Sequence, residues 1–89
     1  SKEIQGLEAQ ELAVRRQLDS LQEEVDRVRP VAEKGFFPFN RLMAMERDIS
    51  NMTGRQGQLK ADISKAHEVI SETRLQIIQI RQKFSEDVL

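Results

Sequence analysis

The feature that most constrains this chain is a pair of apolar heptad seams, one on each side of a stretch rich in Pro and Phe. Along each seam the residues recur at steps of three and four, which is typical of a coiled coil and narrower than the apolar face of a globular helix. The first seam comprises Ile4, Leu7, Glu11, Val14, Leu18, Leu21, Val25, Val28 and Ala32. The second comprises Leu42, Met45, Ile49, Met52, Gln56, Leu59, Ile63, Ala66, Ile70, Thr73, Ile77, Ile80, Phe84 and Asp87.

The second seam predicts one long, unbroken helix. A helical phase held over all of its positions implies roughly 50 residues, or about 75 Å at 1.5 Å per residue. Gly54 and Gly57 oppose this, because each costs on the order of 1 kcal/mol against Ala inside a helix. A loop would have no reason to preserve the phase through Met52, Gln56 and Leu59, so we expect both glycines to lie within the helix, at a soft or closely packed spot. A true break is the alternative.

The stretch between the seams holds the signals of a turn. Gly35 is suited to end the first helix, with Lys34 before it as a cation near the helix carboxyl end. Pro38 can begin a helix because its missing N–H is not needed there, and Asn40 is an alternative N-cap. Pro30 removes the hydrogen bond to the Asp26 carbonyl, so the first helix should kink there or re-form as a short last turn.

The two seams pair in antiparallel order about this turn. Val28 is expected opposite Met45 and Val14 opposite Leu59, and the residue numbers of such pairs add to 73 or 74 throughout. The predicted fold is all-α: an antiparallel two-stranded coiled-coil hairpin whose second helix is the longer. We expect one domain over 1–89, with helix one at about 3–33, the tip at 34–39 and helix two at about 40–87.

Composition excludes several classes of function. The net charge is −1 with both signs interspersed, so no basic face is available for nucleic acid. Cysteine is absent and His67 is the only histidine, so neither a metal site nor a cofactor is expected. Adjacent acidic residues such as Glu23 and Glu24 point in different directions on a helix and cannot share a substrate, so an enzyme is not expected.

No apolar run approaches the roughly 20 residues of a membrane span. Both ends lie inside helical pattern, so we expect a fragment of a larger protein that makes no membrane contact itself.

Two runs of the sequence, RPVAEKGFFPFNRLMAMERDI and ISETRLQIIQIRQKF, resemble the periplasmic adaptors of type I secretion. These are the membrane fusion proteins of the HlyD-like class, and the resemblance is strongest to the PrtE-like adaptors of protease exporters. It implies a periplasmic hairpin of an inner-membrane-anchored protein in a Gram-negative bacterium. The implied partners are an inner-membrane ABC transporter, a TolC-like outer-membrane channel and further copies of the adaptor in a ring.

The resemblance also implies that the tip meets the channel. The wider family carries an Arg, a Leu four residues on and a Ser seven after that, and these offsets fall on Arg27, Val31 and Pro38. Arg27 matches, Val31 is a conservative replacement, and Pro38 lacks the hydroxyl. The candidate docking residues are Arg27, Val31, Phe36, Phe37, Pro38 and Phe39. An alternative for the aromatic residues is that Phe36 or Phe37 folds back over the turn onto Val31 or Leu42.

Two other functions share some of these features. A tripartite drug-efflux adaptor also has such a hairpin, and a generic dimerising coiled coil would also have apolar seams. A generic dimerising coiled coil, however, usually lacks a Pro- and Phe-rich turn whose two arms pair in register.

The far end of helix two is expected to be left without a partner. Pairing by the constant sum exhausts helix one near Thr73, and residues 74–89 still contain many apolar side chains. The candidate contact residues are Leu75, Ile77, Ile78, Ile80 and Phe84, with Val88 and Leu89 beyond them. In the complete protein a further helix should cover them. In the fragment a second copy should do so, which gives a symmetric dimer as a consequence of the cut.

Overall fold

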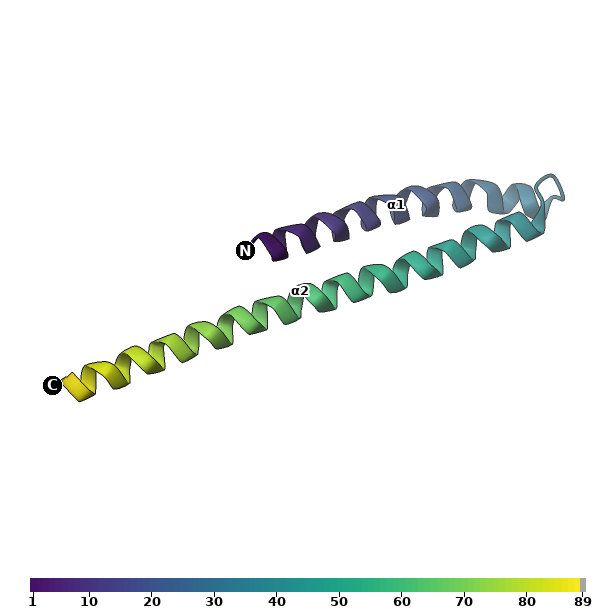
Figure 1. The fold of residues 1–89 in the computed structure, drawn as a ribbon. Coiled ribbons are helices and arrows are strands. Elements are labelled where there is room, and N and C mark those ends of the chain that lie inside the picture. The colour runs from purple at the N-terminus through teal and green to yellow at the C-terminus, as the bar shows by residue number, and fades with distance from the viewer. Residues whose placement is uncertain (89) are drawn as a thin grey trace.

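The computed structural model describes residues 1–88, and they form two helices joined by a short turn. Helix α1 runs over Lys2–Glu33 and helix α2 over Phe39–Val88. The helices lie side by side and antiparallel, and α2 extends well past the amino-terminal end of α1 (Figure 1). The rod measures 82 × 15 × 14 Å. The predicted all-α hairpin with a longer second helix is confirmed.

Helix α1 continues through Pro30 to Glu33. Its amino-terminal end is capped by Ser1, whose Oγ accepts a hydrogen bond from the Ile4 N–H at 3.2 Å. Pro30 lies in the last turn, where it cannot donate to the Asp26 carbonyl, and its own carbonyl accepts from the Lys34 N–H at 3.2 Å. The α-helix is uninterrupted at Pro30, so the separate last turn that the sequence analysis offered as one outcome is not seen.

The core is a thin line of seam residues between the two helices. Val25 is completely buried and Leu42 is 3% exposed, and these two lie near the turn. Ile4, Val14 and Leu59 are also buried, while most other seam residues are half-buried. With so few buried side chains, the stability of the rod depends on each of them.

A polar contact interrupts this apolar line. Glu11 is 9% exposed, and the Gln56 Nε2 donates a hydrogen bond to its Oε1 at 3.1 Å. Arg15 lies 3.9 Å from the other oxygen of the same carboxylate. Thus the one polar residue of the first seam meets a polar residue of the second, and no buried side-chain polar atom within residues 1–88 lacks a hydrogen-bond partner. The sequence analysis did not pair these two residues.

A second polar contact, between Arg29 and Glu46, lies nearer the turn. Long polar side chains can reach along the helices, so neither this contact nor the Glu11–Gln56 contact tests the predicted pairing of the apolar seam residues, which stays a prediction.

Gly54 and Gly57 lie inside α2, which runs without interruption across them. A methyl group built on either glycine would meet nothing within 4 Å. The prediction that both lie within the helix is confirmed, while close packing as their reason is wrong.

Beyond Ile70, every residue of α2 from Ser71 to Val88 is exposed. We call this segment, residues 71–88, the overhang. Neither helix of the described chain has an apolar stretch long enough to cross a membrane.

Candidate functional site at the tip

The turn at the tip is closed by the backbone. Gly35 has a φ of 83°, a left-handed conformation that side chains disfavour. Its N–H donates to the Ala32 carbonyl at 2.9 Å, and the Phe36 N–H donates to the Val31 carbonyl at 3.0 Å. Together these bonds make a Schellman motif, which satisfies carbonyls that the end of α1 would otherwise leave free. Lys34 is the C-cap residue, just past the last helical position.

Helix α2 begins one residue earlier than predicted. The Pro38 carbonyl accepts from the N–H groups of both Arg41 and Leu42, each at 3.2 Å, so Pro38 occupies the capping position. Phe39, expected in the turn, is the first helical residue, and Asn40 lies within the first turn rather than at the cap. The physical reason is that a cap contributes its carbonyl to the first helical hydrogen bond, and Pro38 does this without needing an N–H.

The three phenylalanines at the tip differ in how the fold covers them. Phe36 is 81% exposed and Phe39 is 66% exposed, whereas Phe37 is half-buried. The Arg41 guanidinium carbon lies 5.6 Å from the centre of the Phe37 ring, which is a cation–π distance. The Phe37 ring is thus partly covered by its own chain, with Arg41 over its face. Two rings are left in solvent at the end of the rod.

The remaining predicted tip residues are all exposed. Arg27 and Val31 are one helical turn apart on α1, and Pro38 lies beside the exposed rings in sequence. Arg27 takes part in no ion pair within residues 1–88. The structure therefore leaves Arg27 available to a partner.

Arg29, which the sequence analysis did not single out, ties the two arms together below the tip. Its Nη1 donates to Asp26 Oδ1 at 3.2 Å and its Nη2 to Glu46 Oε1 at 3.3 Å. The hydrogen bonds with Glu46 and Asp26 raise the pKa of the Arg29 guanidinium. The near-seam positions of Arg29 and Glu46 on facing arms were the signal that could have identified this pair.

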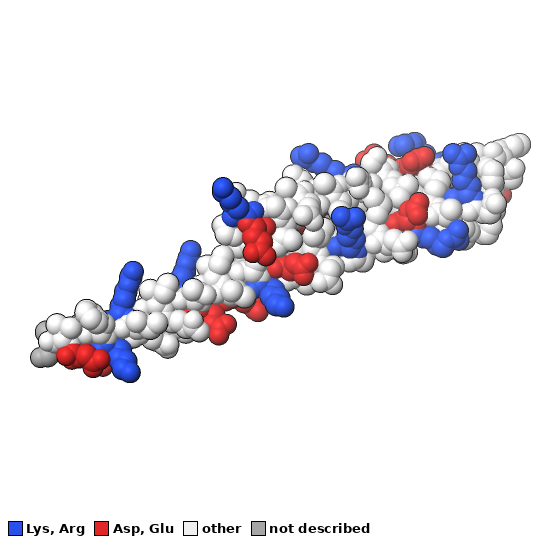
Figure 2. All heavy atoms as spheres, in the orientation of Figure 1, with Lys and Arg blue, Asp and Glu red and all other residues white. Residues whose placement is uncertain are grey.

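The surface charge of the rod changes toward the tip. Figure 2 shows Lys, Arg, Asp and Glu distributed along the whole length, while the extreme end at the turn is mostly uncharged. Such an end fits contact with another protein, because apolar and aromatic side chains dominate the energetics of protein interfaces. No group of three or more potential metal ligands occurs in the described part of the chain.

The predicted contact residues of the overhang lie at the other end. Leu75, Ile77, Ile78, Ile80 and Phe84 are all exposed. Leu89 lies outside the described residues. By helical spacing, Ile77, Ile80 and Phe84 share one side of α2, and Leu75 and Ile78 lie elsewhere. Three of the five predicted contact residues therefore lie on one side of α2.

Comparison with protein families supplies the context for this geometry. The model of one family, described as AprE, long alpha-helical hairpin, matches residues 1–89. Comparisons with curated proteins and with solved structures gave no significant match. The match covers the whole chain and describes the same fold, two long helices joined at one tip. The chain therefore belongs to the AprE long α-helical hairpin family, the hairpin of type I secretion adaptors.

Proposed function

We propose that this chain is the periplasmic spacer and docking hairpin of an inner-membrane-anchored adaptor for type I secretion. In this proposal its tip meets a TolC-like outer-membrane channel, while the rest of the adaptor engages an inner-membrane ABC transporter. The exported cargo is protein, such as a protease. Several copies act together in a ring around the export path.

The observation that carries the proposal is the exposure of Phe36 and Phe39 at a turn that does not need them. Backbone hydrogen bonds close the turn, and Leu42 supplies the buried side chain next to it. Two large apolar rings left mostly in solvent bury little surface within the hairpin, and such residues mark interaction sites.

The shape of the rod supports the same role. The whole rod is 82 Å long, so its tip lies far from its other end. The Arg29–Glu46 contact and the buried pair Val25 and Leu42 fix the two arms just below the tip. A tip held rigidly loses little conformational entropy when it docks.

Arg27 supplies the polar part of the proposed contact. It lies on α1 below the exposed rings and can form paired hydrogen bonds to a carboxylate or to carbonyl oxygens of the channel. The wider family's Ser falls here on Pro38, which has no hydroxyl, so the contact in this chain depends more on Arg27 and the rings.

The test is a secretion assay on the adaptor that contains this chain. Phe36→Asp and Arg27→Glu should each abolish export, because loss of an interface anchor weakens docking by roughly 30-fold or more. Phe37→Asp should act in the same direction, but it also disturbs the contact with Arg41.

Matched controls separate docking from folding. Phe36→Leu keeps an apolar side chain and should retain export, and Arg55→Glu reverses a charge on the exposed middle of α2 and should be silent. Circular dichroism of the hairpin should be unchanged by Phe36→Asp, Arg27→Glu, Phe36→Leu and Arg55→Glu. Normal export with Phe36→Asp and Arg27→Glu would overturn the assignment of the tip. Loss of drug resistance with intact protein export would favour an efflux adaptor instead.

A further inference from the structure

The charged side chains nearest the tip are separated by sign onto two sides of the hairpin. On α1, Asp26 and Glu33 are seven residues apart, and Arg27 and Lys34 repeat that spacing one residue further on. Residues seven apart lie on the same side of a helix, whereas adjacent residues are rotated by about 100°. All four residues are exposed. The acidic pair and the basic pair therefore lie on different sides of α1, at nearly the same height along the rod.

Helix α2 adds a further carboxylate to the acidic side. Arg29 contacts both Asp26 of α1 and Glu46 of α2, so these two carboxylates lie on the same side of the hairpin. We call this surface the acidic flank, and it comprises Asp26, Glu33 and Glu46 around Arg29. Its carboxylates outnumber its one guanidinium, so the acidic flank is negatively charged.

The opposite side of the hairpin carries only positive charge over residues 26–46. Arg41 precedes the buried seam residue Leu42, whereas Glu46 follows the next seam residue, so Arg41 and Glu46 lie on opposite sides of the seam. We call Arg27, Lys34 and Arg41 the basic flank. None of these three takes part in an ion pair within residues 1–88. Their charge is therefore available to a partner.

On the basis of the ring in the proposed function, we propose that the acidic flank of one copy of this chain lies beside the basic flank of the next copy. Both tips point in the same direction. Glu33 of one copy then meets Lys34 of the next, and Asp26 lies at the height of Arg27. Each copy offers a different flank to each of its two neighbours, so the contact repeats until the ring closes.

The heights of the charges fit such a ring. Rotation about an axis parallel to the rods does not shift a residue along the rod, so only residues of equal height can meet in neighbouring copies. Glu33 and Lys34 satisfy this condition because they are adjacent in sequence, and so do Asp26 and Arg27. A two-fold contact would instead place each flank against itself, with like charges opposed. The separation of sign thus favours a head-to-tail contact over a two-fold one.

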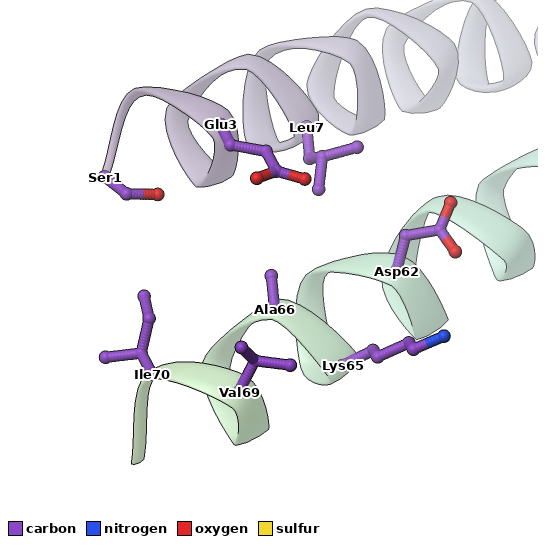
Figure 3. A pocket seen from close by; sticks show the side chains of 8 residues that line it. All are labelled: Ser1, Glu3, Leu7, Asp62, Lys65, Ala66, Val69 and Ile70. Atoms are coloured by element: carbon purple, nitrogen blue, oxygen red, sulfur yellow. The ribbon is translucent and has the colours of Figure 1, made fainter. Parts of the chain in front are cut away.

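The two flanks lie where the helices are held together. Toward the amino-terminal end of α1 a hollow of about 550 Å³ separates the helices, and Figure 3 shows Glu3 and Leu7 of α1 facing Ala66 of α2 across it. Near the tip, by contrast, Val25 and Leu42 are buried. Charges on this packed part of the rod keep their relative positions, so two copies can match their flanks there.

The charges decide which surfaces meet more than how tightly they bind. An exposed ion pair contributes little to affinity and is screened by salt. Complementary charge nevertheless guides the approach of two surfaces, and like charge opposes the wrong pairing. Further from the tip both signs occur on both sides of the rod, so the selection of the neighbour's flank depends on residues 26–46.

Disulfide cross-linking in the adaptor that contains this chain tests the contact. Adaptors with Glu33→Cys and with Lys34→Cys, carrying different tags, are produced together and oxidised; the chain itself has no cysteine. A disulfide requires the two Cα atoms to lie within about 7 Å. The mixed-tag dimer should therefore be the main product, while either variant produced alone should give little, because position 33 of one copy meets position 34 of the next.

The outcomes separate this contact from docking at the tip. An equal yield of dimer from Glu33→Cys alone would overturn the head-to-tail contact. No mixed-tag dimer, although both cysteines react with a maleimide, would overturn the proposal. If Phe36→Asp also abolishes export in that case, the docking function stands without the lateral contact. A mixed-tag dimer together with normal export by Phe36→Asp would give the reverse result.

Charge reversal tests the chemistry of the contact. Glu33→Lys opposes two positive charges at every interface and Lys34→Glu opposes two negative ones, so each should weaken the contact by roughly threefold to tenfold and lower export. The double variant Glu33→Lys/Lys34→Glu pairs opposite charges again and should recover export, whereas a fixed contact with the channel would not be restored. Glu23→Lys, on the exposed back of α1, is the matched control and should be silent. A double variant that exports no better than either single variant would refute the pairing.

Discussion

Replacing Gly54 and Gly57 by Ala should stabilise the hairpin. Both glycines lie in the interior of α2, and a methyl group on either one meets nothing within 4 Å. The substitution therefore adds helix propensity without a steric cost. Each should raise the free energy of unfolding by about 1 kcal/mol, and the double variant should be more stable than either single variant. For a chain of this size, each kcal/mol corresponds to a rise in Tm of about 4–8 °C.

The assay is thermal unfolding followed by far-UV circular dichroism. It should be run at low protein concentration, because self-association would make Tm depend on concentration and mask the intrinsic effect. Urea unfolding of the same variants should shift the midpoint without changing the slope, since the surface exposed on unfolding is unchanged.

Gly35→Ala is the internal control, because it makes the same chemical change at a position of opposite conformation. The φ of 83° at Gly35 disfavours any side chain, so Ala there should cost about 1–2 kcal/mol. Destabilisation by Gly54→Ala or Gly57→Ala would refute the reasoning, because it would mean that α2 bends there or that another surface packs against the glycines.

Three further predictions concern the core, the polar contact and the tip. Gln56→Leu removes the hydrogen-bond donor of the largely buried Glu11, so it should lower the free energy of unfolding in urea by about 1–3 kcal/mol. The double variant Glu11→Leu/Gln56→Leu should recover that loss, because no buried carboxylate is left without its partner. A double variant no more stable than Gln56→Leu would contradict this account of the polar contact. Leu42→Ala should cost about 2–5 kcal/mol in the same assay, while Phe36→Ala should stay within about 0.5 kcal/mol of the parent; a large effect of Phe36→Ala would mean that the fold needs this ring. Glu46→Ala should lower the free energy of unfolding only slightly, and the loss should shrink in high salt, because the Arg29–Glu46 pair is exposed to solvent; a salt-independent loss would indicate packing instead.

The fold could be predicted from the sequence because the seams carry two independent signals. The unbroken phase through Gly54 and Gly57 indicated one long helix, and the turn residues between the seams indicated where the chain reverses. Gly35 was identified as the residue that ends α1 because few other residues adopt its conformation. These features depend on local chemistry and on periodicity, which a sequence shows directly.

The details that the sequence did not reveal depend on side-chain geometry. The Glu11–Gln56 contact was missed because pairing was inferred from apolar positions, although two polar positions in facing seams were the signal. The assignment of Phe39 to the turn was wrong because the Pro38 carbonyl, rather than the Asn40 side chain, begins α2. The partial burial of Phe37, in contrast to Phe36 and Phe39, depends on the path of the turn and on the position of Arg41. The periodicity of the sequence indicates neither of these. The docking roles of Arg27, Val31 and the tip residues stay predictions.

The central claim, that the tip is the docking surface, is tested most directly by site-specific photo-cross-linking in cells. A photoreactive residue would replace Phe36 at the tip, and in a separate strain Gln22, which is exposed on the middle of α1. The account predicts a cross-link between position 36 and an outer-membrane channel protein, and none from position 22. A channel cross-link from position 22 without one from position 36 would contradict it.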